Sequence, residues 1–296
     1  IMAMKFLGKL ELGMTQIMPK SVPHVTQQII QLSLDHGLSP VSPIGFVHLG
    51  SYMAKLGDIN GGYYYVKLAL ALLDRVGSRE SAGEVIAYGT QVRAYVEPLQ
   101  AALEYHNEGY AAAMASGDVF LAAANILFST SLFADVNLET IREKCVEVIK
   151  FMEQRKIVIL MVQTQYILRS MLKLIGTDEE PKHVSDEEQN ILATNNSTMT
   201  TYYYQKLYIS FMFRSYDDTK HYTEKYLACI GNTWANLLLG HASFSFYVGL
   251  VSFWFARKED EQIWYERGEK SKLALKKWTE SSLWTFENKW LLLEAE

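Results

Sequence analysis

The feature that most constrains the fold of this chain is a repeated turn phrase. An alanine- and aromatic-rich amphipathic run stops at a small Gly/Asp-type turn, and another such run begins at once. Glycine closes one helix and aspartate caps the next, which is how arrays of helical hairpins are punctuated. The sequence therefore predicts an all-α fold, arranged as an α-solenoid of about five or six helical hairpins. The phrase occurs at Leu56-Gly57-Asp58, Ser116-Gly117-Asp118 and Ser215-Tyr216-Asp217, and more loosely at Arg257-Lys258-Glu259.

Helical periodicity extends along nearly the whole chain, which we interpret as a single array over residues 1–296, with a possible subdivision at the acidic, proline-containing 176–200 loop. Ser81 with Glu84, and Ser185 with Glu188, each have the spacing of a capping box at a helix start. Residues 157–162 have the composition of a short buried strand, but their flanks continue a helical period. The predicted helices are 19–36, 43–56, 61–75, one from about 81, 98–116, 119–134, 137–155, 157–175, a short one from 185, 199–214, 217–230, 233–256, 259–279 and one from 283.

Charge and cysteine content exclude several classes of protein. The net charge is -5, and Lys and Arg are scattered rather than gathered into a stripe, so the chain lacks the basic footprint of a nucleic-acid-binding protein. The two cysteines, Cys145 and Cys229, form neither a disulfide framework nor a zinc-binding spacing. This pattern is typical of a reducing compartment, and we expect a cytoplasmic protein.

The usual enzyme signatures are missing: the phosphate-binding loop, the dinucleotide fingerprint, the serine-hydrolase elbow, the zinc-protease helix and the kinase motifs. His106-Asn107-Glu108 matches part of a zinc-deaminase motif, but its cysteine partner is missing, and we interpret it as a polar cluster on a helix surface. Asp217 and Asp218 invite comparison with terpenoid synthases, although capping of a helix N-terminus explains them with less strain. We therefore expect no catalytic residue, no cofactor and no metal in this chain. The alternative is an all-α enzyme acting on a diphosphate or an apolar small molecule in a central cavity lined by the two aspartates, aromatic residues and opposing carboxylates.

One segment is long and apolar enough to be considered as a membrane span. Residues 236–256 carry no charged side chain other than His241, and length alone would allow a span. Polar residues are distributed around this helix, however, and no Lys/Arg flank precedes it. A buried helix in the middle of the array is the favoured interpretation.

Two tyrosine triplets, at 63–65 and 202–204, are the densest aromatic clusters. Three consecutive residues of a helix cannot all face inward, so at least one ring in each triplet should meet solvent or a neighbouring protein. Packing between helices is the favoured role for such rings. Because tyrosine is enriched at interfaces, we also take Tyr63, Tyr64, Tyr202 and Tyr203 as candidate protein-contact residues.

Read as whole phrases, the chain resembles the helical-repeat segment of very large multidomain signalling kinases. In that family a protein-kinase-like region and a P-loop ATPase module come first, and a GAF domain and often a histidine kinase follow. The resemblance implies a tetratricopeptide-like regulatory spacer without catalytic residues of its own. It is carried by Ser42-Pro43-Ile44-Gly45-Phe46, by the stretch from Lys55 to Tyr63, by Leu68 to Asp74, by Glu97-Pro98-Leu99 with Gly109-Tyr110 and Ser116-Gly117-Asp118, and by the closing phrase from Asn288 to Glu296.

From these observations we expect a non-catalytic scaffold that mediates protein–protein contacts or relays a signal within a multidomain ATPase/kinase protein. Both ends of the sequence read as mid-helix, so we expect it to be a piece of a longer polypeptide. Its partners would be other domains of that polypeptide or a separate signalling protein. We expect neither nucleic acid nor a membrane among them.

Overall fold

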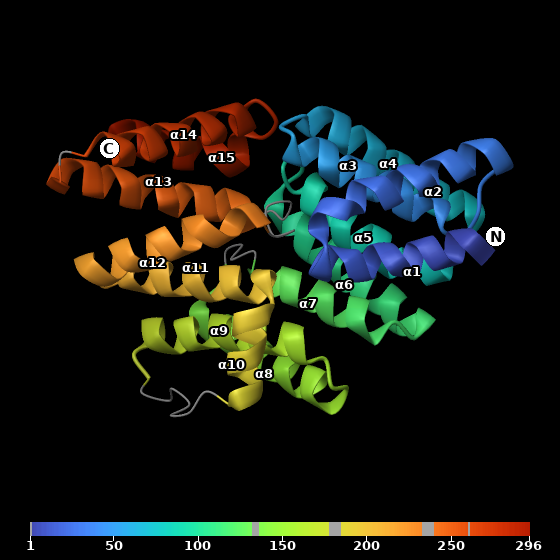
Figure 1. Ribbon diagram of the computed structural model, residues 1–296, viewed down its shortest axis with the longest axis horizontal. Helices are drawn as coiled ribbons and strands as arrows, with labels where there is room; N and C mark the ends of the chain where they lie inside the picture. Colours follow the sequence, from blue (N-terminus) through green and yellow to red (C-terminus); the bar gives the residue numbers. More distant parts are fainter. Residues whose placement is uncertain (1, 132–135, 178–184, 233–239, 260) are drawn as a thin grey trace.

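The protein is all-helical, as the sequence predicts (Figure 1). The structure is a computed structural model that describes residues 2–131, 136–177, 185–232, 240–259 and 261–296, and these contain no β-strand. The helices are α1 (Met2–Ile17), η1 (Pro19–Ser21), α2 (Val22–His36), α3 (Ser42–Lys55), α4 (Ile59–Val76), α5 (Arg79–Arg93), α6 (Leu99–Ser116), α7 (Val119–Ser131), α8 (Leu138–Gln154), α9 (Val158–Ile175), α10 (Asp186–Thr194), α11 (Asn196–Met212), α12 (Tyr216–Cys229), η2 (Ile230–Asn232), α13 (Gly240–Glu259), α14 (Gln262–Thr279) and α15 (Leu283–Ala295).

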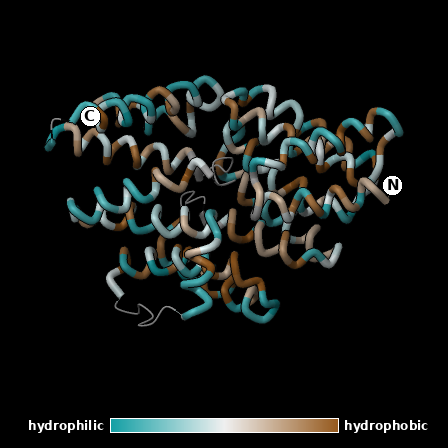
Figure 2. Tube along the Cα trace, viewed as in Figure 1, coloured by the Kyte–Doolittle hydropathy of each residue, from teal (hydrophilic) through white to brown (hydrophobic). Residues whose placement is uncertain are grey.

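Helices that follow one another in sequence pack against one another in space, most closely in the pairs α3–α4, α5–α6, α8–α9, α11–α12 and α13–α14. In Figure 1, α13–α15 lie above α11–α12, which in turn lie above α8–α10, while α1–α7 occupy the other side. Apolar and polar residues are interspersed along the helices (Figure 2). The alternative of a strand at 157–162 is wrong, because Ile157 is the N-cap of α9 and the rest of the segment is helical.

The first two turn phrases adopt the predicted geometry. Gly57 and Gly117 have positive φ angles of 91° and 78°, which glycine accepts without a Cβ clash. Asp58 accepts a hydrogen bond from the Gly61 amide, and Asp118 accepts one from the Leu121 amide. Each phrase therefore ends one helix and caps the next.

The other two phrases differ from this prediction. At the third, Arg214 takes the left-handed conformation (φ 58°) in place of a glycine, and Ser215 occupies the N-cap position of α12. Asp217 lies within the first turn of α12, where its negative charge interacts favourably with the helix dipole. Its side chain makes no capping hydrogen bond. At the fourth, Arg257-Lys258-Glu259 still belongs to α13, and the break follows it.

We expect Asp58→Ala to lower the free energy of unfolding by about 1 kcal/mol, since it removes the acceptor for an N-terminal amide of α4. Asp74 lies exposed near the C-terminal end of the same helix, where a carboxylate opposes the helix dipole. Asp74→Ala is therefore the matched control and should leave stability unchanged or slightly raised. Urea unfolding followed by circular dichroism measures both, and equal midpoints for the two variants would refute the cap.

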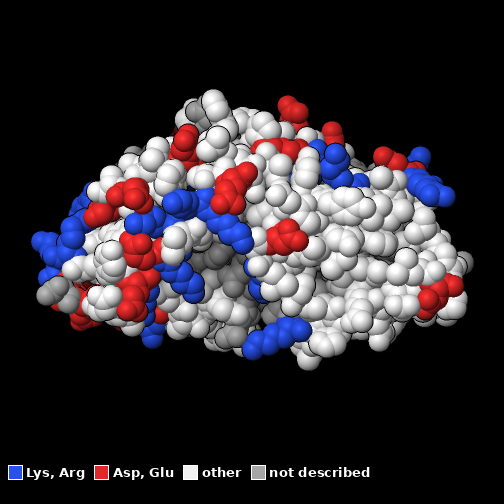
Figure 3. Space-filling view, turned by 90° about the horizontal axis from the view of Figure 1, so that it is seen from above, with Lys and Arg blue, Asp and Glu red and all other residues white. Residues whose placement is uncertain are grey.

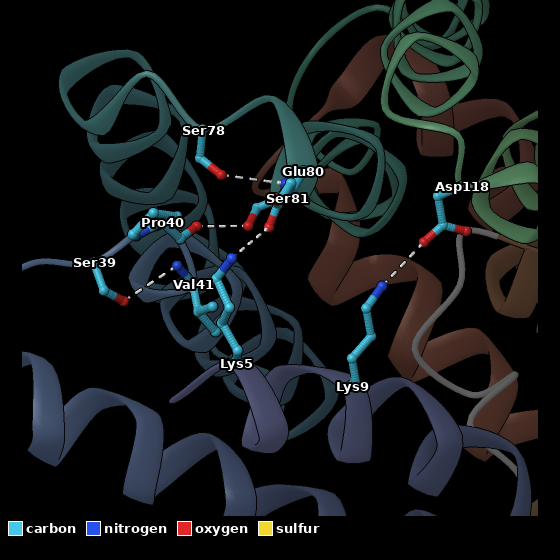
Figure 4. Close-up of polar contacts among 9 residues, drawn as sticks. All are labelled: Lys5, Lys9, Ser39, Pro40, Val41, Ser78, Glu80, Ser81 and Asp118. Carbon is cyan, nitrogen blue, oxygen red and sulfur yellow. Dashed lines mark hydrogen bonds and ion pairs between the residues drawn. The ribbon is translucent and has the colours of Figure 1, made fainter. Parts of the chain in front are cut away.

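The capping box expected at Ser81 and Glu84 is wrong. Helix α5 begins earlier, because the Ser78 hydroxyl caps it by accepting a hydrogen bond from the Ser81 amide. The Ser81 hydroxyl instead donates to the Pro40 carbonyl oxygen at 2.6 Å, which ties α5 to the loop before α3 (Figure 4). The same view shows Lys5 paired with Glu80, which joins α1 to α5. Ser185 does cap α10 as predicted, accepting from the Glu188 amide.

The predicted 176–200 interruption is partly described. Gly176 ends α9 with a φ of 83°, residues 178–184 lie outside the described part of the chain, and α10 follows. The helix predicted to begin at residue 199 begins earlier, at Asn196, because the Asn195 side chain caps α11 by accepting from the Thr198 amide. A subdivision of the chain here stays a prediction.

The described helices contain one segment, α9, that is long and apolar enough to cross a membrane by length and composition, and half of it is buried against other helices. The segment singled out from the sequence, 236–256, is described only from Gly240 onward, as part of α13.

The chain also packs on itself over a long sequence distance. Tyr95, which follows α5, lies with its ring centroid 5.5 Å from that of Trp278 and 5.6 Å from that of Phe286. Around them a hydrophobic cluster joins residues of α4–α6 to residues of α13–α15. A simple array, in which each hairpin buries its apolar face only against its neighbours, has no such contact.

Candidate functional site

The four candidate tyrosines lie in two separate places. On α4, the Tyr63 hydroxyl donates to Glu97 at 2.9 Å, and Arg93 holds the same carboxylate at 3.0 Å. Tyr64 is 64% exposed. Together with residues one turn away, the two rings border a shallow pocket of about 410 Å³. Tyr63 therefore belongs to a hydrogen-bonded network, whereas Tyr64 is open to a partner.

On α11, the rings of the second triplet have three different environments. Tyr202 packs edge-on against Tyr166 of α9, with centroids 5.0 Å apart, and Tyr203 is half-buried against the core formed by α11–α14. Tyr204 is fully buried in that core. Of these three, Tyr202 lines a pocket.

We call this pocket the tyrosine groove: a concave surface of about 410 Å³ between α9, α10, α11 and α12. One wall is fixed by Arg169, whose guanidinium pairs with the buried Glu188 carboxylate through Nη2 and Oε2 at 2.9 Å. Tyr222 of α12 also lines the groove. The Gln205 side chain is 6% exposed, and its Oε1 has no hydrogen-bond partner within the described residues. The groove is thus bordered by aromatic side chains and by the Arg169–Glu188 ion pair.

A second and larger concavity was not expected from the sequence. We call it the central hollow: a cavity of about 660 Å³ bordered by the α3–α4 turn, α12, α13 and α14. Its walls are mainly apolar and aromatic, with Tyr95, Tyr226, Phe244, Val248 and Trp278 among the lining residues. Cavities of this size and composition are typical of ligand sites.

The charged residues that line the central hollow are all basic within the described part of the chain. Arg267, Lys270 and Lys277 come from α14, and Lys55 comes from the end of α3. Partial desolvation lowers the pKa of Lys55. Viewed from above, Lys and Arg side chains gather around a hollow in the surface (Figure 3). The helical spacing of 267, 270, 274 and 277 places these residues on one face of α14, and this stripe is the signal from which the sequence could have revealed the site.

The structure corrects the interpretation of His106 as part of a surface cluster. His106 is 1% exposed, and its ring nitrogens bond Gln91 at 2.8 Å and Asn125 at 3.1 Å. Burial lowers the pKa of His106 to about 4, so the imidazole is neutral near pH 7. Asn125 also donates to the Gly83 carbonyl oxygen, so that the network joins α5, α6 and α7. Its role is structural.

The two aspartates proposed for a diphosphate site do not line the central hollow. The Ser215 hydroxyl donates to Asp218 at 2.8 Å, and Asp218 borders the tyrosine groove instead. Across the described ranges, no group of three or more His, Cys, Asp or Glu side chains is placed to hold a metal ion.

A second buried polar cluster joins the first helix to the rest of the fold. Glu11 of α1 is fully buried and accepts a hydrogen bond from Thr26 of α2. His48 of α3 lies 3.0 Å from Glu84 of α5. Burial raises the pKa of Glu11 to about 7, although the nearby His48 opposes the shift. The attraction of Glu11 and Glu84 outweighs desolvation at His48 and raises the pKa of its imidazole.

Comparison with known proteins adds no family assignment. No protein-family model matches the sequence, and a search of curated proteins also gives no match. The resemblance to the helical segment of multidomain signalling kinases therefore rests on the phrases quoted above.

Proposed function

We propose that this chain is a non-catalytic helical-repeat scaffold, a tetratricopeptide-like α-solenoid that binds protein within a multidomain ATPase/kinase signalling protein. The packing of hairpins in chain order supports the repeat architecture. The long-range hydrophobic cluster around Tyr95 packs the middle helices against the C-terminal helices. This contact would transmit a displacement of the helices at one end of the array to those at the other. Both cysteines are free and buried, in keeping with a cytoplasmic protein.

The observation that carries the protein-contact proposal is the tyrosine groove. Tyr202 lines this groove and packs against Tyr166, and the Arg169–Glu188 pair holds a neighbouring part of the wall. Rigid tyrosines with supporting neighbours bind partners at a low cost in conformational entropy. Tyr63 is already engaged with Glu97, so the α4 cluster offers less.

The membership in a larger protein is tested by reading the coding sequence outward from both ends of this segment. A GxxxxGK[ST] motif upstream, and a GAF or histidine-kinase region downstream, is the expected result. A start codon and a stop codon next to residues 1 and 296 would contradict the multidomain proposal.

The flanking domains, expressed separately, should bind the chain in isothermal titration calorimetry. We expect Tyr202→Ala to weaken that binding at least tenfold, because truncation of an aromatic anchor in a groove costs about 1.4 kcal/mol or more. Tyr64→Ala, at an exposed ring on the other side of the molecule, is the matched control. Weakened binding by Tyr64→Ala, with Tyr202→Ala unchanged, would place the contact on α4 and overturn the assignment to the groove.

A further inference from the structure

The central hollow has features that a protein-contact groove does not need. Its walls come from segments far apart in the sequence: the α3–α4 turn and Tyr95 on one side, and Tyr226, Phe244 and Val248 on the other. Apart from the basic residues, the described side chains that line it carry polar groups only at Ser245, Ser271 and the aromatic residues. A peptide backbone enclosed there would leave amide groups without hydrogen-bond partners, whereas a hydrocarbon chain has none to satisfy.

The four cations at the hollow form no ion pair within the described part of the chain. None of Lys55, Arg267, Lys270 and Lys277 forms an ion pair with a described residue, although the chain as a whole carries a net charge of -5. A methyl group at Gly57 would lie 2.9 Å from Lys277 Nζ, so this ammonium sits directly against the α3–α4 turn. Like charges gathered beside a low-dielectric cavity favour the binding of an anion.

Tyr226 contributes its ring to the apolar wall of the hollow. Its side chain is 2% exposed and lines the cavity. Its hydroxyl oxygen is buried away from the accessible space of the hollow, so the ring is the part of Tyr226 that a hydrocarbon chain would contact.

We propose that the central hollow binds an alkyl carboxylate, with its hydrocarbon chain against the aromatic walls and its carboxylate held by the basic residues of α14 and α3. The charge complementarity selects an anion over a neutral lipid, and the scarcity of polar lining groups selects a hydrocarbon chain over a peptide. The site is separate from the tyrosine groove, so the two proposals stand or fall independently.

The direct test is a fluorescence titration of the chain with 11-(dansylamino)undecanoate, followed by displacement with unlabelled ligands. Dodecanoate should displace the probe with a stoichiometry of one molecule per chain. Dodecan-1-ol should compete with the probe with an affinity at least tenfold lower. Each methylene removed should weaken binding about fourfold, so that hexanoate scarcely competes. Dodecyl phosphate distinguishes a carboxylate site from a general site for anionic lipids. Equal affinity for dodecanoate and dodecan-1-ol, or no binding of the probe, would overturn the proposal.

Variants locate the site. The double variant Lys270→Gln, Lys277→Gln should bind dodecanoate at least tenfold more weakly than the unmodified protein does. Its affinity for dodecan-1-ol should be unchanged, because both lysine side chains are exposed and their replacement removes only charge. Lys150→Gln, an exposed lysine of α8 outside the hollow, is the charge-matched control. Ser245→Phe, which fills the hollow, should abolish binding of the probe. Circular dichroism confirms that each variant is folded, and unchanged affinity in the double lysine variant would refute the assignment.

Discussion

Gly62→Ala is expected to destabilise the protein by about 2 kcal/mol, although alanine is the better helix former. A Cβ atom at Gly62 would lie 2.6 Å from the Gly50 carbonyl oxygen of α3 and 3.1 Å from the backbone nitrogen of Ala54. Both obstacles belong to the backbone, so no rotamer change relieves them and the two helices must separate. Overpacking of this kind costs up to about 3 kcal/mol, and the gain in helix propensity of about 1 kcal/mol offsets part of it.

The contact is reciprocal, which allows a sharper test. A Cβ atom at Gly50 would lie 2.7 Å from the Gly62 carbonyl oxygen, so Gly50→Ala should cost a similar amount. Once α3 and α4 have separated, the second substitution has little left to disrupt, and the double variant should be less destabilised than additivity requires. Gly13 of α1 has no atom within 4 Å of its Cβ position, so Gly13→Ala should be neutral or stabilising. Urea midpoints measure the set, and a Gly62→Ala midpoint equal to that of the unmodified protein would disprove the close crossing.

Local features of the fold could be predicted because they depend on neighbouring residues. The Gly57-Asp58 and Gly117-Asp118 turns are determined by one residue that tolerates positive φ and one that caps a helix. The same local reasoning failed at Ser81. Ser78 was an equally good capping residue, and the Ser81 hydroxyl donates its hydrogen bond to the Pro40 carbonyl oxygen. It failed again at Arg214, where a residue without a strong preference for positive φ closes the helix.

The concave sites depend on distances that sequence spacing does not contain. Tyr202 could be chosen as a candidate because a triplet must expose a ring, but the Arg169–Glu188 pair that shapes its groove joins two helices across the undescribed 178–184 stretch. The central hollow is harder still to predict, since Lys55 and Lys277 line one cavity in a fold where Tyr95 packs against Trp278 and Phe286 over a long sequence distance. The basic stripe of α14 is visible in the sequence, but the apolar cavity beside it is not.

Stability should fall as the pH rises through neutrality, because of the buried Glu11. Burial raises the pKa of this carboxyl to about 7 in the folded protein, against an ordinary value of 4.5. Between these values the folded protein binds a proton that the unfolded chain has released, so folding is favoured at low pH and this advantage is lost as pH rises through 7. At about 1.4 kcal/mol per pKa unit, the loss amounts to roughly 3 kcal/mol over the whole window.

The raised pKa of His48 acts in the same direction, since its stabilising contribution is also present at low pH and lost as pH rises through the folded pKa. His106 acts in the opposite direction. Its pKa is lowered by burial to about 4, so the unfolded chain binds the extra proton and stability rises with pH up to about 6.5. Below pH 6.5 the rise in stability due to His106 therefore opposes the fall due to Glu11 and His48. Above pH 6.5 the fall in stability due to Glu11 and His48 should dominate.

Glu11→Gln removes the titrating carboxyl group together with its attraction for the His48 imidazole. Glutamine keeps the hydrogen bond from Thr26 without titrating, so the variant should match the unmodified protein at pH 5 and exceed its stability by roughly 2–3 kcal/mol at pH 8.5. Urea midpoints at half-unit intervals from pH 5 to 8.5 give the difference between the two proteins, from which the His106 contribution cancels. Glu80→Gln is the control, since that carboxylate is exposed and its pair with Lys5 lies at the surface. A difference that does not change with pH would show that Glu11 titrates as an ordinary carboxyl, and hence that α1 does not bury it as the structure describes.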